Sequence, residues 1–110
     1  MEVYAVVGWE ITFEELYRKW DCQNIDDFYN KLDDLHYHVQ NWEFSGVDTN
    51  YYFGVDMYIT GSADSPAIMD EVAFCQWVKD TKHRMLQEGS TKFTGGIYMP
   101  LRPRLFIVAE

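Results

Sequence analysis

A run near the start of the chain is apolar on both of its alternating faces, and it limits the folds open to the protein. Residues 3–9 read Val-Tyr-Ala-Val-Val-Gly-Trp, with no charged side chain. A strand with one solvent face alternates apolar and polar residues, whereas a strand buried on both faces is apolar throughout. The run therefore predicts a strand in the middle of a sheet. The 110 residues of the chain suffice for one domain around that sheet.

Two helices are predicted to follow that strand. Thr12 with Glu15 three residues on matches the capping-box pattern, and a short helix over 13–20 comes after it. Asn24 is the expected N-cap of a second helix over 25–38, in which apolar residues recur in steps of three and four. Each helix has one apolar face, so both are expected to pack against the sheet.

The second half of the chain is predicted to hold further strands and the longest helix. Residues 40–50 read as a short strand or a loop, and residues 51–60 alternate as a half-exposed strand does. The long helix is expected to run from Ser65 as N-cap and Pro66 at its first position to Gly89 at its end. The pattern ends with a loop over 90–104, which holds a short strand at 97–99, and a final strand over 105–108.

The order β-α-α-β-α-β predicts a single α+β domain over residues 1–110. Two or three helices are expected to pack against a mainly antiparallel sheet of three to five strands. The longest apolar runs fall far short of the roughly 20 residues that a membrane-spanning helix needs. No secretory signal pattern opens the sequence, so we expect a cytoplasmic protein that does not enter a membrane.

The sequence shows no motif of catalysis, cofactor binding or metal binding. Cys22 and Cys75 lack the spacing of a zinc site or a disulfide framework, and we interpret them as reduced thiols. His36 and His38 would point about 200° apart on the predicted helix, too far to share a metal ion. No glycine pattern typical of nucleotide binding occurs. We expect neither an enzyme nor a cofactor.

Charge is distributed unevenly along the chain. The protein has 18 acidic and 9 basic residues and a net charge of −9. Residues 1–78 hold 15 of the carboxylates and only three basic residues, whereas residues 79–110 hold six basic residues and three carboxylates. This bipolar pattern favours a charged partner, but an isoelectric point near 4.6 argues against direct binding to nucleic acid. The alternative is that the surplus acid serves solubility alone.

The most acidic feature is the polar face of the predicted helix over 25–38. Aspartate is a poor helix former, and its repetition on one face adds like-charge repulsion, which a need for solubility alone does not explain. Rigidly spaced carboxylates can imitate phosphates toward a groove lined with Lys and Arg. We therefore expect these residues and their acidic neighbours to bind a basic, nucleic-acid-binding protein: Asp26, Asp27, Asp33, Asp34, Asp21, Glu14 and Glu15.

Aromatic residues make up 17% of the chain, more than one small core readily hides. Tyr and Trp are favoured anchors at protein interfaces. Tyr29 and Tyr37 flank the acidic helix, Trp42 follows it, and Tyr52 and Tyr58 occupy the polar face of the strand over 51–60. We include Tyr37, Trp42, Tyr52 and Tyr58 in the predicted partner contact, and we name Tyr29 only as a further exposed candidate. The alternative is that they cover the edge of the sheet or form a homodimer contact.

Small size, strong acidity, many aromatic residues and the lack of a catalytic motif make the chain similar to phage-encoded inhibitors of host defence, such as anti-restriction and anti-CRISPR proteins. The resemblance is one of composition and covers no motif, so it assigns no residue. It implies a stoichiometric, non-enzymatic inhibitor that occupies the nucleic-acid groove or an activating surface of a defence enzyme.

Two other functions remain open on the sequence. In the first, the protein binds or sequesters an anionic nucleotide, and Lys92, Arg102 and Arg104 hold its phosphates, since guanidinium groups suit that geometry. In the second, the chain is a homo-oligomeric structural component of a virion. The first predicts a thermal shift with nucleotides, and the second predicts a concentration-dependent multimer.

Overall fold

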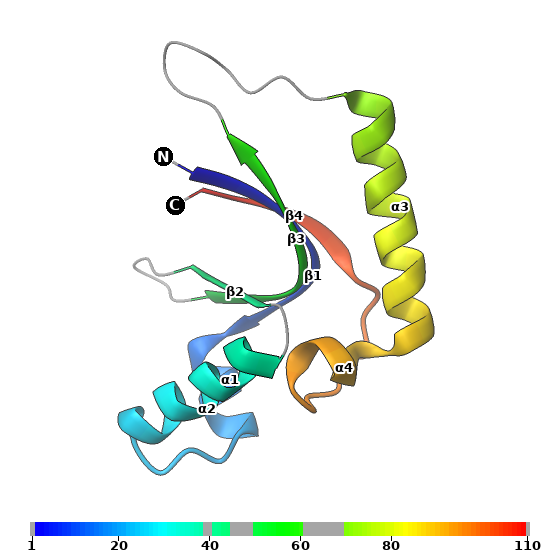
Figure 1. The fold of residues 1–110 in the computed structure, drawn as a ribbon. Helices are drawn as coiled ribbons and strands as arrows, with labels where there is room; N and C mark the ends of the chain where they lie inside the picture. The colour runs from blue at the N-terminus through cyan, green and yellow to red at the C-terminus, as the bar shows by residue number, and fades with distance from the viewer. Residues whose placement is uncertain (1, 39–40, 45–49, 61–69, 110) are drawn as a thin grey trace.

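The structure, a computed structural model, describes residues 2–38, 41–44, 50–60 and 70–109 (Figure 1). These residues form a small α+β domain, which confirms the predicted class. The elements, in chain order, are β1 (Glu2–Thr12), α1 (Phe13–Lys19), α2 (Ile25–His38), β2 (Asn41–Phe44), β3 (Asn50–Thr60), α3 (Glu71–Glu88), α4 (Ser90–Thr94) and β4 (Arg104–Ala109).

The strands form one antiparallel sheet in the order β2-β3-β1-β4. β1 pairs with β3 over all eleven of its residues, and with β4 only up to Gly8, which lies opposite Arg104. The strand expected in the middle of a sheet thus has a neighbour on each side, as its apolar pattern requires. β2 and β4 are the two edges of the described sheet.

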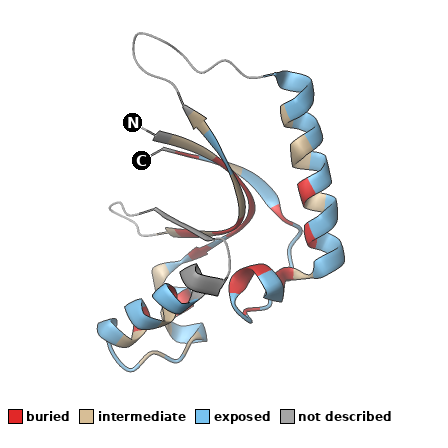
Figure 2. Cartoon of the chain, viewed as in Figure 1, coloured by how far each residue is buried: buried red, intermediate tan, exposed pale blue. Residues whose placement is uncertain are grey.

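All the helices of the described residues lie on one side of this sheet, which we call the helix-bearing face. At one end of it, α1 and α2 pack Leu16, Phe28 and Leu32 against residues of β1 and β3. Toward the middle, α3 and α4 contribute Met85 and Phe93 to a second cluster. Figure 2 shows that buried residues follow β1 between these helices, while the outer side of α3 is exposed.

The opposite side of the sheet is concave, and no helix of the described residues covers it (Figure 1). Val6 points to this concave face and is nevertheless fully buried. Tyr4 of β1, Tyr52 of β3 and Phe106 of β4 pack around it and shield it from solvent. The concave face is therefore lined by aromatic rings that three strands supply.

Several of the predicted helix boundaries are confirmed. The Thr12 side chain accepts a hydrogen bond from the Glu15 backbone N–H at 3.3 Å and caps α1. Asn24 Oδ1 accepts from the Asp27 N–H at 2.9 Å at the start of α2, whose range matches the prediction. Gly89 ends α3 with φ of 86°, a conformation that favours glycine.

Three expectations for the second half of the chain are wrong, and one of them is the loop over 90–104, whose first five residues form α4 and bring the described helices to four instead of two or three. The long helix begins at Glu71 rather than Pro66, because Asp70 Oδ1 accepts the Ala73 N–H at 3.0 Å and caps it. Ser65 and Pro66 lie outside the described residues. No strand forms at 97–99; the segment instead packs on the short helix α4, where the Met99 N–H donates to Ser90 Oγ at 3.0 Å.

Candidate functional site

The acidic residues predicted to bind a partner belong to a unit made of α1, α2 and the turn between them. We call this unit, residues 13–38, the acidic lobe. Phe28 holds it to the sheet, because its ring is fully buried where the lobe meets β3. Five other rings surround Phe28 at centroid distances of 4.6 to 6.2 Å, namely those of Phe13, Tyr17, Trp20, Tyr29 and Tyr51. The lobe is thus fixed by packing, and its outer face keeps a defined shape.

Three of the four aspartates of α2 face solvent. Asp26, Asp33 and Asp34 are exposed on the sides of the helix that point away from Phe28 and Leu32. Among the described residues, these three carboxylates take part in no hydrogen bond or ion pair. No described residue therefore pairs with their charges.

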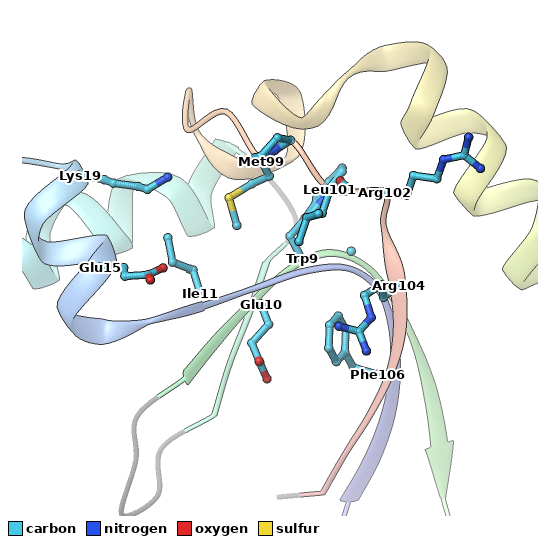
Figure 3. Close-up of a pocket in the computed structure, with 12 residues that line it drawn as sticks. Trp9, Glu10, Ile11, Glu15, Lys19, Met99, Leu101, Arg102, Arg104 and Phe106 are labelled. Atoms are coloured by element: carbon cyan, nitrogen blue, oxygen red, sulfur yellow. The ribbon is translucent and has the colours of Figure 1, made fainter.

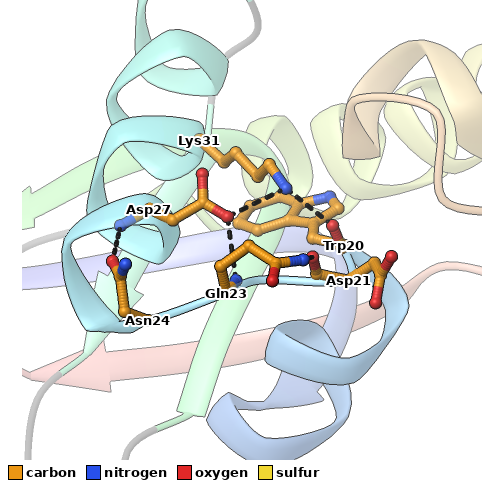
Figure 4. Close-up of polar contacts among 6 residues, drawn as sticks. All are labelled: Trp20, Asp21, Gln23, Asn24, Asp27 and Lys31. Carbon is orange, nitrogen blue, oxygen red and sulfur yellow. Dashed lines mark hydrogen bonds and ion pairs between the residues drawn. The ribbon is translucent and has the colours of Figure 1, made fainter.

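Asp27 differs from the other three, because it is tied into the turn that precedes α2 (Figure 4). Its Oδ2 accepts the backbone N–H of Gln23 at 3.0 Å and lies 3.3 Å from Lys31 Nζ. Lys31 also donates to the carbonyl oxygen of Trp20 at 2.8 Å. The Gln23 hydrogen bond, followed by Lys31, holds the pKa of Asp27 below its ordinary value. Asp27 therefore stabilises the lobe and is the least available of the four aspartates.

The remaining acidic candidates lie on or beside α1. Glu14 and Glu15 are exposed in its first turn, where a negative charge suits the helix dipole. Asp21 is exposed just after α1 with φ of 53°, in the left-handed region that Asp tolerates better than most residues. The lobe therefore carries exposed carboxylates on both helices and on the turn between them.

Two of the predicted aromatic contacts, Tyr52 and Tyr58, lie on the concave face. Tyr58 is 52% exposed, and its ring meets that of Tyr4 edge-on at 5.2 Å. Tyr52 is half-buried, with its ring 5.1 Å from that of Phe106. Burial, and then a hydrogen bond with Glu10, raise the pKa of Tyr52. These two tyrosines share a face with each other, but not with the aspartates of α2.

The other aromatic candidates are placed differently. Tyr29 is half exposed on α2 and packs edge-on against Phe28 at 5.6 Å. The side chains of Tyr37 and Trp42 lie outside the described residues. Of the described aromatic candidates, Tyr29 therefore lies within the acidic lobe, whereas Tyr52 and Tyr58 belong to a separate surface.

A cavity of about 310 Å³ lies where β4 stops pairing with β1 (Figure 3). Trp9 forms part of its wall and donates from Nε1 to the carbonyl oxygen of Leu101 at 2.6 Å. Arg102 and Arg104, two residues of the alternative nucleotide site, line this cavity. Lys92, the third, does not line it and instead lies 3.2 Å from Glu88 in an ion pair.

The cavity does not gather its charges as an anion site requires. Figure 3 shows that Arg104 points to the concave side beside Phe106. Arg102 extends away from Arg104, toward α3. Glu10 and Glu15 line the same cavity and oppose a negative ligand, and Lys19, the third cation of the lining, comes from α1 on the side opposite the two arginines (Figure 3). The alternative nucleotide function thus gains a cavity but no convergent cationic site.

The described residues offer no arrangement for metal chemistry. Among them, no group of three or more His, Cys, Asp and Glu side chains could hold a metal ion. The side chains of His36 and His38 lie outside the described residues. Cys22 is half-buried in the lobe and Cys75 is exposed on α3, and both are free thiols.

No helix in the described part of the chain is both long and apolar enough to span a bilayer.

Comparison with known proteins adds no further assignment. No protein-family model, curated protein or solved structure matches this chain.

Proposed function

We propose that this protein is a non-enzymatic inhibitor that binds a basic, nucleic-acid-binding protein through the acidic lobe and competes with its nucleic acid. The observation that carries the proposal is the unbalanced charge of α2. Asp26, Asp33 and Asp34 are exposed and unpaired among the described residues, while Asp27 engages Lys31, the one lysine of the helix.

The lobe has the rigidity that phosphate mimicry needs. From Asp26 to Asp34 the helix rises about 12 Å, at about 1.5 Å per residue. Phe28 anchors the opposite side of the same helix in the core. The carboxylates are therefore held in a fixed row instead of on a mobile segment. Such a row attracts a Lys- and Arg-lined groove at long range and competes with the nucleic acid that the groove binds.

The experiment compares two charge-matched variants with the native protein. The lobe variant carries Asp26→Asn, Asp33→Asn and Asp34→Asn. The control variant carries Glu71→Gln, Asp80→Asn and Glu88→Gln, which remove the same number of exposed carboxylates from α3, including one in its first turn. Each protein is immobilised and incubated with lysate of the cells in which the native protein occurs. Free duplex DNA is then used to elute the lysate proteins that have bound. Mass spectrometry then identifies the eluted proteins.

We expect the native chain and the control variant to retain a nucleic-acid-binding protein, and duplex DNA to release it. The lobe variant should not retain this protein. The same partner should dissociate at about 0.5 M salt, where exposed charges are largely screened. Purified native protein should then displace labelled DNA from that partner, and the lobe variant should not. Equal retention by all three proteins would exclude the acidic lobe as the contact.

A further inference from the structure

A hollow of about 230 Å³ lies between the end of α3 and the segment that leads into β4, next to the cavity of Figure 3. Trp9 and Met85, which are 5% and 0% exposed, form its floor. Leu86, Tyr98 and Leu101 form its walls and are between 52% and 71% exposed. Apolar side chains clustered around a hollow at the surface are typical of a binding site. Pockets for drug-sized ligands measure roughly 300 to 1,000 Å³, so this hollow suits a smaller ligand.

The segment that forms one side of the hollow is held in place. Trp9 Nε1 donates to the carbonyl oxygen of Leu101 at 2.6 Å, and so joins the wall to the floor. Pro100 and Pro103 fix the backbone φ on either side of this contact. The hollow is therefore preorganised, and a ligand would not have to order the segment when it binds.

The charged side chains at the hollow are basic. Among the described residues that line it, only Arg102 is charged, and Figure 3 shows that its side chain extends toward α3. Lys82 is half-buried one turn before Leu86, on the same side of α3. The C-terminal end of a helix carries a partial negative charge of about half a unit, which these two full positive charges outweigh.

The carboxylates of the neighbouring elements do not line this hollow. Glu88, at the end of α3, is not part of its wall and lies 3.2 Å from Lys92 Nζ in an ion pair. Glu10 and Glu15 belong to the lining of the adjoining cavity instead. The hollow thus combines an apolar interior with charge of one sign, which the adjoining cavity does not.

We propose that this hollow binds a small carboxylate with an apolar body. The apolar body lies on Trp9 between Leu86 and Leu101, and the carboxylate pairs with the guanidinium group of Arg102, which can donate two parallel hydrogen bonds. The site differs from the nucleotide site considered above, because it uses Arg102 without Arg104. A free organic acid and the last residue of a peptide chain share this chemistry, and the experiment separates them.

The first test titrates the native protein with phenylacetate and follows the methyl signals of Leu86 and Leu101 by NMR. Phenylacetamide has the same ring without the charge, and acetate has the charge without the ring. We expect phenylacetate to shift both signals and phenylacetamide to bind about tenfold more weakly or less. Acetate should shift neither signal over the same concentrations. Binding of phenylacetamide as tight as that of phenylacetate, or equal shifts with acetate, would overturn the proposal.

The second test compares two arginine variants of equal charge. Arg102→Gln removes the proposed partner of the carboxylate. Arg104→Gln is the control, because Arg104 does not line the hollow and points to the concave side (Figure 3). We expect Arg102→Gln to weaken binding of phenylacetate by about tenfold and to leave that of phenylacetamide unchanged. Arg104→Gln should change neither. Equal losses of phenylacetate binding for the two variants would overturn the role of Arg102.

A further pair of variants tests the apolar wall. Leu86→Ser should weaken binding of phenylacetate and phenylacetamide alike, since both place the same ring against this side chain. Ile25→Ser is the control, because Ile25 is 47% exposed on the acidic lobe and should leave both affinities unchanged. Affinities that Leu86→Ser leaves unchanged would place the ligand outside the hollow.

The source of the carboxylate is tested with the N-acetylated tripeptide Gly-Gly-Phe and its C-terminal amide. Binding of the peptide acid, but not of the amide, at least as tight as that of phenylacetate would support the proposal with the end of a protein chain as ligand. Binding of phenylacetate without binding of the peptide acid would support it with a free organic acid. None of these variants changes an aspartate of α2, so the result is independent of the partner proposed for the lobe.

Discussion

Gly8 and Gly54 lie directly opposite each other in β1 and β3, and neither position has room for a side chain. A Cβ on Gly8 would stand 1.8 Å from the carbonyl oxygen of Phe53, and a Cβ on Gly54 would stand 2.1 Å from that of Val7. Both obstacles are backbone atoms of the neighbouring strand, so they cannot rotate away. The glycine pair therefore lets β1 and β3 approach closely at this position.

Replacement of Gly8 by alanine should be severely destabilising. Gly8→Ala forces the two strands apart at the centre of the sheet, and we expect a loss of about 3 kcal/mol or more, or failure to fold. Gly96→Ala is the control, because nothing lies within 4 Å of its Cβ position and only its φ of 96° opposes a side chain. That strain alone should cost about 1 to 2 kcal/mol. Urea denaturation measures both, and equal losses would contradict the close approach of the strands.

Much of the fold was predictable because local signals agree with the tertiary structure. The apolar run in β1, the cap at Thr12 and the stop at Gly89 each determine an element from a few adjacent residues. The start of α3 was missed because a start at Pro66 places Asp70 inside the helix, whereas Asp70 is the cap. α4 was missed because five residues are too few to show helical periodicity.

The placement of the site residues was harder to predict, because it depends on contacts between elements. The spacing of four aspartates in α2 gave no sign that Asp27 would bind Gln23 and Lys31 while the other three stay exposed. The alternating pattern of β3 correctly placed Tyr52 and Tyr58 on one face. Which strand lies at the edge is a property of long-range pairing, so the place of β4 at the edge of the described sheet carries no local signal.

The acidic lobe should depend on Phe28 for its attachment. Phe28→Ala removes the ring that contacts the five neighbouring aromatic rings, and we expect the free energy of unfolding to fall by about 3 to 5 kcal/mol. Tyr29→Ala, on the half-exposed side of the same helix, should cost about 1 kcal/mol or less. Urea unfolding followed by tryptophan fluorescence measures both, and Trp20 in the lobe reports on it directly. A loss for Phe28→Ala as small as that for Tyr29→Ala would show that the lobe does not rest on this ring.

The turn before α2 should lose stability in acid through Asp27. Its pKa is depressed in the folded protein, so its hydrogen bond with Gln23 contributes fully above the unfolded pKa of about 3.9. That contribution disappears as the pH falls through the lower, folded value. We therefore expect Asp27→Asn to lower the melting temperature at pH 7, and the difference from the native protein to shrink as the pH falls below about 4. Asp26→Asn is the control, because this carboxylate is exposed and has no partner among the described residues. A difference that stays constant with pH would rule out the carboxylate of Asp27 as its source.

The two thiols should differ in reactivity, because only one of them packs in the acidic lobe. Cys22 is half-buried against the cluster around Phe28, and burial raises its pKa, which reduces the fraction of reactive thiolate. Cys75 is exposed on α3. At pH 7.5 we expect iodoacetamide to modify Cys75 about tenfold faster than Cys22, as peptide mass mapping over time would show. In urea above the unfolding transition, the two rates should become similar, since the packing that protects Cys22 is then lost. Faster modification of Cys22 in the folded protein would mean that the turn between α1 and α2 opens readily, and that the carboxylates of the lobe are not held in a fixed row.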